Sequence, residues 1–247
     1  MREWFENEDF WREMYPYMFD EQRFATADKE VRKILKLTGV RRGAVLDLCC
    51  GPGRHSVALA KRGFQVTGVD RTRYLLNKAR RRAKSARARI EFVRADMRDF
   101  VRPDAYRLVL NMFTAFGYFD KKDEDRLVLR NIFTSLKPGG ACLIDVMGKE
   151  RLAKIMQSSL AERHADGSLL VQFHEIFDDW TRIRNEWILL KGNRVRRFKF
   201  HHTIYSGQEL KDMLRTAGFA EVKLFGDLDG QPYGPDAARL VAVARKA

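Results

Sequence analysis

The chain has 247 residues, 45% of them hydrophobic, and a formal net charge of +14 at pH 7. This is enough apolar material for a complete α/β core, most simply one domain with additions. No apolar run approaches the roughly 20 residues that span a bilayer, and the acidic, aromatic start is unlike a signal peptide. The three cysteines lack metal-binding spacing, so we expect reduced thiols in a cytoplasmic protein without a metal site.

The first 38 residues are unusually aromatic, and residues 31–37 then place apolar side chains at helical spacing. We expect most of these rings to anchor the segment to the core by burial. The aromatic residues are Trp4, Phe5, Phe10, Trp11, Tyr15, Tyr17, Phe19 and Phe24.

A glycine turn follows the first strand-like run. Residues 45–53 read Val-Leu-Asp-Leu-Cys-Cys-Gly-Pro-Gly, which predicts a buried strand and a tight turn, followed by a helix over 54–62 and a strand over 66–70. Asp70 ends that second strand, where a carboxylate can accept hydrogen bonds from both ribose hydroxyls of a nucleotide. Ser56 replaces the third glycine of a dinucleotide fingerprint. Asp47 would repel a pyrophosphate but suit a ligand that carries an ammonium group.

This stretch resembles the first motif of the class I S-adenosylmethionine (SAM)-dependent methyltransferases, commonly Val-Leu-Asp-Leu-Gly-Cys-Gly-Thr-Gly. The chain differs from that pattern at Cys49 and Pro52. Residues 90–97, 107–113 and 136–145 resemble the family's third, fourth and fifth strands, so the likeness spans residues 40–147. It implies an α/β fold: a seven-stranded, mostly parallel Rossmann-like sheet with helices on both faces.

The resemblance also implies the cofactor, S-adenosyl-L-methionine, with S-adenosyl-L-homocysteine as product. Asp96 takes the position that meets the adenine amino group. The cofactor-binding residues implied are Asp47, Cys49, Gly51, Gly53, Asp70, Arg71, Ala95, Asp96, Met97 and Asn111. Ala115-Phe-Gly-Tyr118, with a later β insertion, resembles small-molecule N- and O-methyltransferases, which transfer the methyl group by in-line displacement. The alternatives are an RNA methyltransferase and a non-catalytic SAM-binding protein.

Nine basic residues and no acidic one occur between Arg71 and Arg89. This pattern is typical of a polyanion-binding helix. It is equally typical of a solvated helix face, because Leu75, Leu76 and Ala79 supply a buried side. We favour the solvated face, since RNA binding also needs exposed aromatics and this stretch has only Tyr74.

Residues 167–205 contain three stretches of alternating polarity, 169–177, 182–190 and 195–204, which predict an antiparallel sheet. Glu175, Asn185 and His202 interrupt the apolar phases, so we expect them on the inward face. Polar groups on a buried face need hydrogen-bond partners. These three could satisfy one another, or they could bind a substrate. His202 is the best candidate base, because imidazole titrates near neutrality, whereas His174 and His201 are expected on the outward face.

The tail predicts a helix over 208–217 and strands over 222–225 and 239–244, which the resemblance pairs as an antiparallel edge hairpin. It further implies an N-terminal helical lid over residues 1–38, a SAM-binding core over 39–150 and 206–247, and a substrate cap of one helix and antiparallel β-sheet over 151–205. The candidate catalytic residues are His202, Tyr118 and Tyr15. The candidate substrate-binding residues are Tyr17, Phe116, Glu175, Asn185 and Tyr233, the last of which otherwise belongs to a turn-rich loop. The expected substrate is a small, acidic molecule, with nucleic acid as the less favoured partner, no membrane, and a monomer or homodimer.

Overall fold

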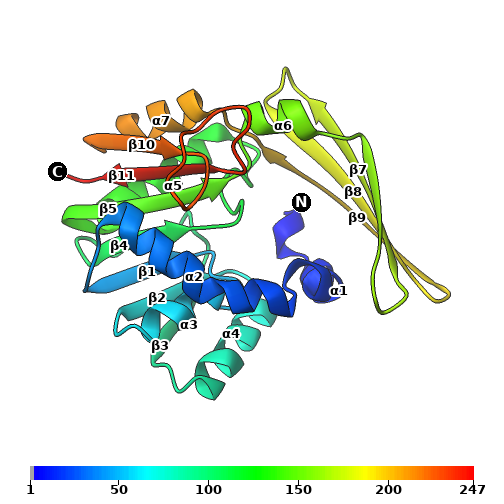
Figure 1. Ribbon diagram of the computed structural model, residues 1–247, viewed down its shortest axis with the longest axis horizontal. Coiled ribbons are helices and arrows are strands. Elements are labelled where there is room, and N and C mark those ends of the chain that lie inside the picture. The colour runs from blue at the N-terminus through cyan, green and yellow to red at the C-terminus, as the bar shows by residue number, and fades with distance from the viewer. Residues whose placement is uncertain (1–2) are drawn as a thin grey trace.

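Two β-sheets organise the chain (Figure 1). The computed structural model describes residues 3–247, so residues 1–2 of the expected lid lie outside the described residues. The larger sheet has seven strands in the order β10-β11-β5-β4-β1-β2-β3. Its strands are β1 (Ala44–Leu48), β2 (Gln65–Asp70), β3 (Ile90–Arg94), β4 (Tyr106–Asn111), β5 (Leu136–Val146), β10 (Glu221–Phe225) and β11 (Leu240–Arg245).

Strands β1 to β5 are parallel, and β11 runs antiparallel to both β5 and β10. The predicted seven-stranded, mostly parallel sheet with an antiparallel edge hairpin is therefore confirmed. Val45, Leu46 and Leu48 in β1 are almost completely buried. An apolar strand buried on both faces is what a parallel sheet covered by helices requires.

Helices cover both faces of this sheet, because alternate strand residues point to opposite sides. On one face α2 and α3 contribute to an apolar cluster that includes Val45 and Leu108. On the other face α5 and α7 share a cluster with Leu46 and Val109. These helices, with the basic α4, are α2 (Glu21–Thr38), α3 (Arg54–Ala60), α4 (Arg73–Ser85), α5 (Lys122–Ser135) and α7 (Gly207–Thr216).

The basic helix α4 has a buried apolar side, as predicted from Leu75, Leu76 and Ala79. Two of its cations lie over aromatic rings of the N-terminal segment. Lys78 Nζ is 4.8 Å from the ring centre of Tyr15, and the Arg82 guanidinium lies over Phe24. Part of the positive charge of α4 therefore holds the N-terminal segment in place.

The smaller sheet extends away from the core on the carboxyl side of β5 (Figure 1). Strands β7, β8 and β9 confirm the three predicted stretches, whereas the prediction did not include β6. The short α6 (Lys149–Ile155) connects β5 to this sheet. Its strands are β6 (Ser159–Arg163), β7 (Leu169–Phe177), β8 (Arg182–Lys191) and β9 (Arg194–Thr203), all antiparallel.

One predicted face of this sheet is wrong. His174 pairs across the strands with Asn185, and Asn185 with Phe200, so these three side chains share the inward face. Glu175 instead points outward, is exposed, and pairs with Arg184. The sequence misled because β7 has apolar residues in both phases, and only its register with β8 decides which phase faces inward.

The N-terminal segment lies between the two sheets, formed by the 3-10 helix η1 (Trp4–Glu6) and by α1 (Glu8–Met18) (Figure 1). The Trp4 ring lies 4.7 Å from that of Tyr118 and 4.9 Å from that of Phe200, so one side chain touches the core and the smaller sheet. The division of the chain into lid, core and cap stays a prediction.

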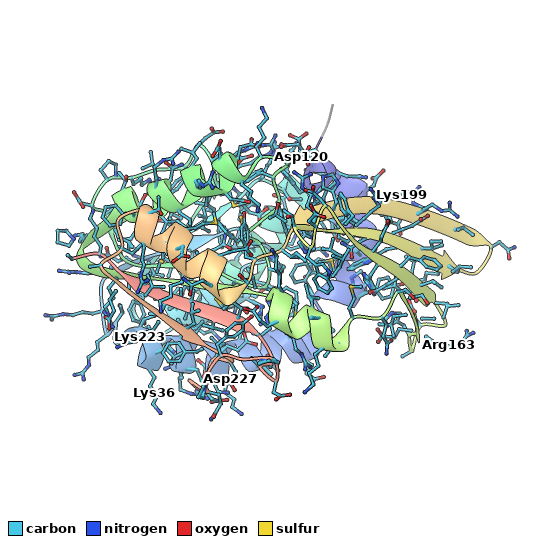
Figure 2. The ribbon with its side chains drawn as sticks, turned by 90° about the horizontal axis from the view of Figure 1, so that it is seen from above. Lys36, Asp120, Arg163, Lys199, Lys223 and Asp227 are labelled. Atoms are coloured by element: carbon cyan, nitrogen blue, oxygen red, sulfur yellow. The ribbon has the colours of Figure 1, made fainter. Side chains whose placement is uncertain are left out.

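Charged side chains are distributed over the whole surface (Figure 2). Lys36 and Lys223 project from the core, and Arg163 and Lys199 project from the smaller sheet. None of the helices in the described part of the chain has the length and apolarity that a membrane span requires.

Candidate cofactor and active site

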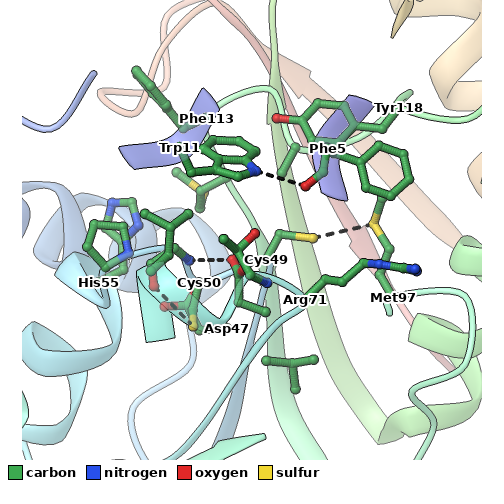
Figure 3. A pocket seen from close by; sticks show the side chains of 18 of the residues that line it. Phe5, Trp11, Asp47, Cys49, Cys50, His55, Arg71, Met97, Phe113 and Tyr118 are labelled. Atoms are coloured by element: carbon green, nitrogen blue, oxygen red, sulfur yellow. Dashed lines mark hydrogen bonds between the residues drawn. The ribbon is translucent and has the colours of Figure 1, made fainter. Parts of the chain in front are cut away.

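A cavity lies at the carboxyl ends of β1, β2 and β4, where the glycine turn leaves β1 (Figure 3). The turn needs left-handed backbone at three positions, with φ of +61° at Cys49, +53° at Gly51 and +78° at Gly53. Glycine adopts this region freely, whereas Cys49 does so with strain. Cys49 nevertheless adopts the left-handed conformation, so a cysteine in place of the glycine usual in the family motif leaves the path of the turn intact.

Asp70 is the buried carboxylate at the centre of the site, 8% exposed. Its Oδ2 accepts a hydrogen bond from the Gly51 N–H at 2.8 Å, and its Oδ1 accepts one from the Thr72 N–H at 2.8 Å. Burial raises the pKa of Asp70 to about 6. The Thr72 side chain also hydrogen-bonds Asp70, and a carboxylate can accept about four hydrogen bonds, so Asp70 keeps acceptor capacity for a ligand in the cavity that it lines.

Asp47 is a second buried carboxylate on the cavity wall, and burial raises its pKa. Its Oδ2 accepts a hydrogen bond from the Ser56 hydroxyl, at the position where a dinucleotide fingerprint has its third glycine. The cavity wall therefore carries two carboxylates close to the turn. This arrangement disfavours a pyrophosphate and favours a ligand with a positive group.

Asp96 also lines the cavity, but arginines already occupy its carboxylate. Oδ1 accepts from the backbone N–H and Nε of Arg98 at 2.8 and 3.1 Å, and Oδ2 accepts from Arg98 Nη2 at 2.8 Å and from Arg71. These hydrogen bonds, from Arg98 above all, hold the pKa of Asp96 below its usual value despite the opposing effect of burial. A further donor can bind Asp96 only if one arginine moves.

The N-terminal segment covers the cavity. Phe5 and Trp11 line it, joined by a hydrogen bond of 2.8 Å from the Trp11 indole N–H to the Phe5 carbonyl (Figure 3). Arg98 binds Glu3 at 2.8 Å, and Arg71 pairs with Glu6, which ties this cover to the two arginines on Asp96. Tyr118 also lines the cavity, and its ring stacks on that of Phe5 with 5.9 Å between the ring centroids. Burial raises the pKa of its phenol, so it stays protonated.

The structure brings most of the predicted cofactor residues together in this cavity. These are Asp47, Cys49, Gly51, Asp70, Arg71, Ala95, Asp96 and Met97. Gly53 and Asn111 lie outside its lining. A Cβ on Gly53 would meet Ala79 of α4, and the fully buried Asn111 amide donates to the Leu48 carbonyl. Gly53 therefore allows the turn to pack closely against α4, and Asn111 joins β4 to β1.

Most of the predicted catalytic and substrate residues lie elsewhere. The Tyr15 hydroxyl accepts from Arg82 of α4 at 3.4 Å, and the Tyr17 hydroxyl donates to Asp166, beside the smaller sheet, at 3.4 Å. Phe116 is fully buried, and the Tyr233 hydroxyl donates to Glu150 at 2.5 Å. Of the aromatic hydroxyl candidates in the described chain, Tyr118 is the one that reaches the cavity.

His202 and Asn185 line a different cavity, between α6 and the smaller sheet. Loss of solvation there, with the nearby charges of His201 and His174, lowers the pKa of His202 to about 4. The imidazole is therefore neutral at physiological pH and is a weak base. The predicted role as a base that titrates near neutrality is not supported by this environment.

Sequence reasoning did not assign His55 or Phe113 to the site, although both line the cavity. His55 Nε2 is 2.7 Å from Glu30 of α2, and Phe113 has a left-handed backbone with its N–H donated to Asp145 at 3.1 Å. His55 follows the glycine turn directly, which was an available signal. Nothing in the local sequence marks Phe113.

A family of methyltransferase domains matches residues 45–140, which run from β1 through the glycine turn and β2 to β4 into the start of β5. YqeM of Bacillus subtilis, itself a candidate methyltransferase, is 28% identical over 83% of this chain and 85% of its own length. The cypemycin N-terminal methyltransferase of a Streptomyces species is 26% identical over 82% of each chain. The solved structure of a S-adenosylmethionine-dependent methyltransferase from Clostridium acetobutylicum covers 97% of this chain and 98% of that one with a TM-score of 0.79.

That solved structure is 12% identical to this chain and so shows the shared fold alone. The domain match and the relatives add the activity class. Residues 45–140 form a methyltransferase domain, and the chain as a whole is similar to methyltransferases in sequence and shares the fold of a S-adenosylmethionine-dependent one.

Proposed function

We propose that the cavity beneath η1 and α1 binds SAM and that the protein transfers the methyl group to a nitrogen or oxygen of a small molecule. The observation that carries this proposal is the buried Asp70 carboxylate, which lines the cavity and keeps acceptor capacity beyond its hydrogen bonds with Gly51 and Thr72. The ribose hydroxyls of SAM would use that capacity. SAM supplies a methyl group already activated by its sulfonium, so the protein has to bind, align and exclude water.

The remaining groups of the cavity suit the rest of the donor. Asp47 places negative charge beside the turn, which favours an ammonium group. Ala95 and Met97 provide apolar walls for the adenine ring, and Asp96 would hold its amino group once Arg71 or Arg98 releases one carboxylate lone pair. Tyr118 and Phe5 offer aromatic faces, which attract a cation such as a sulfonium.

The covering segment would have to move for the donor to enter. The free volume left beneath it is about 100 Å³. Small-molecule sites typically begin at about 300 Å³. We infer that η1 and α1 swing outward to admit SAM and return afterwards, guided by the pairs that Arg71 and Arg98 form with Glu6 and Glu3. The returned segment would keep water from the sulfonium.

Calorimetric titration with SAM tests the proposal. Asp70→Ala should weaken SAM binding at least tenfold, because it removes both ribose acceptors and two hydrogen bonds that shape the turn. Asp212→Ala is the matched control, since Asp212 is an exposed carboxylate on α7 whose partner is Gln208. Equal SAM affinity in Asp70→Ala and in the unmodified protein would refute the site. The amine chemistry named for the cypemycin relative makes amines the first acceptors to test with labelled donor.

A further inference from the structure

A second cavity of about 240 Å³ lies between α6 and the inward face of the smaller sheet. Met147, which directly follows β5, is one of the lining residues, so the cavity lies on the same carboxyl side of the large sheet as the glycine turn. Ligands of such sheets bind at this edge. The lining is Met147, Leu152, Ile155, Met156, Gln157, Leu160, His174, Ile183, Asn185 and His202.

The polar part of this lining holds an unused hydrogen-bond donor. Asn185 is 4% exposed, and its Oδ1 is 2.7 Å from His174 Nδ1. Its Nδ2 is buried and finds no hydrogen-bond partner among residues 3–247. An unpaired buried donor is unfavourable, and a ligand oxygen placed against the amide would offset that cost.

The hydrogen bond between Asn185 and His174 also fixes which of its two atoms donates and which accepts. Because Asn185 Oδ1 is an acceptor, His174 Nδ1 donates the hydrogen bond between them. His202 is neutral and offers one donor and one acceptor. The cavity therefore presents both donors and acceptors along one polar wall and aliphatic side chains along the others.

Charge is missing from this wall. Among the described residues that line the cavity, none is a lysine, arginine, aspartate or glutamate. Burying an ion without a partner is strongly unfavourable, so the cavity selects against charged ligands.

A short aromatic wall separates this cavity from the donor site. Asn185 is the cross-strand neighbour of Phe200, Phe200 contacts Trp4, and Trp4 contacts Tyr118 of the donor cavity. Trp4 belongs to the covering segment that has to move for SAM to enter. The Trp4 indole N–H is also buried without a partner in the described structure.

We propose that this second cavity binds the methyl acceptor, an uncharged small molecule with an apolar body and a carbonyl or hydroxyl oxygen seated on the Asn185 amide. Its reacting end extends past Trp4 toward Tyr118. This inference rests on the proposed function, and it replaces the expectation of an acidic substrate, which the net charge alone had suggested.

Ligand-observed and histidine-detected NMR tests the cavity without any methyl transfer. Benzamide should bind at least tenfold more tightly than benzoate and should shift the imidazole signals of His174 and His202. Asn185→Leu should weaken benzamide binding at least fivefold. Leu152→Phe, which narrows the cavity from α6 and leaves Asn185 in place, should weaken benzamide binding as well. This variant takes the place of Asn185→Leu in the test if Asn185→Leu fails to fold. Glu175→Gln, on the outward face, should leave benzamide binding unchanged.

A second measurement tests the acceptor role. The probe for this measurement is a benzamide with an alkyl chain on its ring, long enough to pass Trp4. With S-adenosylhomocysteine and this probe bound together, nuclear Overhauser effects between the alkyl chain and S-adenosylhomocysteine should appear, because these arise only between protons that lie close together. Benzoate binding as tightly as benzamide, or a benzamide affinity that neither variant changes, would overturn the site. Binding of the extended probe without contact to bound S-adenosylhomocysteine would overturn the acceptor role. Failure of S-adenosylhomocysteine to bind, in contrast, would count against the proposed function itself.

Discussion

The pH dependence of SAM binding follows from the environment of Asp70. Burial raises its pKa to about 6 in the free protein, so lowering the pH protonates it in the range where enzymes are commonly assayed. Ribose hydroxyls donate hydrogen bonds to the ionised form and would lower this pKa in the complex. Proton release therefore accompanies binding, and SAM affinity should rise as the pH rises through 6.

The size of the effect can be worked out from that pKa. At pH 5 about one-tenth of the free protein has Asp70 ionised, whereas at pH 7.5 nearly all of it does. If the bound form titrates below about pH 4, the dissociation constant for SAM should be about tenfold larger at pH 5 than at pH 7.5. Calorimetry in buffers of different ionisation enthalpy measures both the affinity and the released proton.

Two variants identify the responsible group. Asp70→Asn should bind SAM weakly and with little dependence on pH. Asp47→Asn should retain the dependence, although the Asp47 charge faces Asp70 and contributes to raising the pKa of Asp70. A dissociation constant that changes less than twofold between pH 5 and 7.5 in the unmodified protein would refute the reasoning. A tenfold change that persists in Asp70→Asn would refute it equally.

The raised pKa also has a consequence for folding. In the unfolded chain Asp70 ionises near pH 3.8, below its folded value of about 6. The folded state then binds more protons between these two values, so the contribution of Asp70 to stability is present at low pH and is lost as the pH rises from about 4 to 6. At neutral pH the ionised Asp70 therefore lowers the free energy of unfolding, and the same ionised carboxylate lines the cavity.

Other predictions concern the scaffold. Gly117→Ala should lower the free energy of unfolding by about 2 kcal/mol or more, because φ is +97° there and a Cβ would lie 2.5 Å from the Thr203 carbonyl; chemical denaturation measures it. Ser206→Ala should lower the free energy of unfolding by about 1 kcal/mol in the same assay, since the Ser206 side chain caps α7. An unchanged free energy of unfolding would mean that this cap does not stabilise the protein. Arg98→Gln should speed proteolytic cleavage within the first 20 residues several-fold by releasing Glu3, whereas an unchanged cleavage rate would remove Arg98 from the closure. Filter binding tests whether the basic helix α4 binds RNA. We expect no RNA retention, whereas an RNA methyltransferase would show retention with a steep salt dependence.

Much of the donor site was predictable because its signals are local. The strand, the glycine turn and Asp70 lie within 26 consecutive residues, from Val45 to Asp70, and each needs only its neighbours in sequence to be recognised. Asn111 and Phe116 illustrate the limit. Both follow the family pattern in position, yet their side chains are buried behind the cavity, because strand β4 and the following loop turn them toward the core.

The smaller sheet shows a different limit. Period-two patterning located β7, β8 and β9, but β7 is apolar in both phases, so it could not tell Glu175 from His174. Register with β8 places His174 against Asn185, and the hydrogen bond between them turns two residues into one polar wall. Such a pair is set by cross-strand geometry, and no single strand contains that information.

The sequence by itself predicted the proposed donor site: the turn, its two glycines and Asp70 indicate a nucleotide-binding edge, because backbone conformation and the pattern of strands are encoded locally. The tertiary structure alone decided what surrounds that edge. It brings Glu3 to Arg98, Trp4 to both Tyr118 and Phe200, and His174 to Asn185, contacts that join residues far apart in the chain or in different strands. Pairing of charges and closure of cavities depend on distances in space, and those distances exist only once the chain has folded.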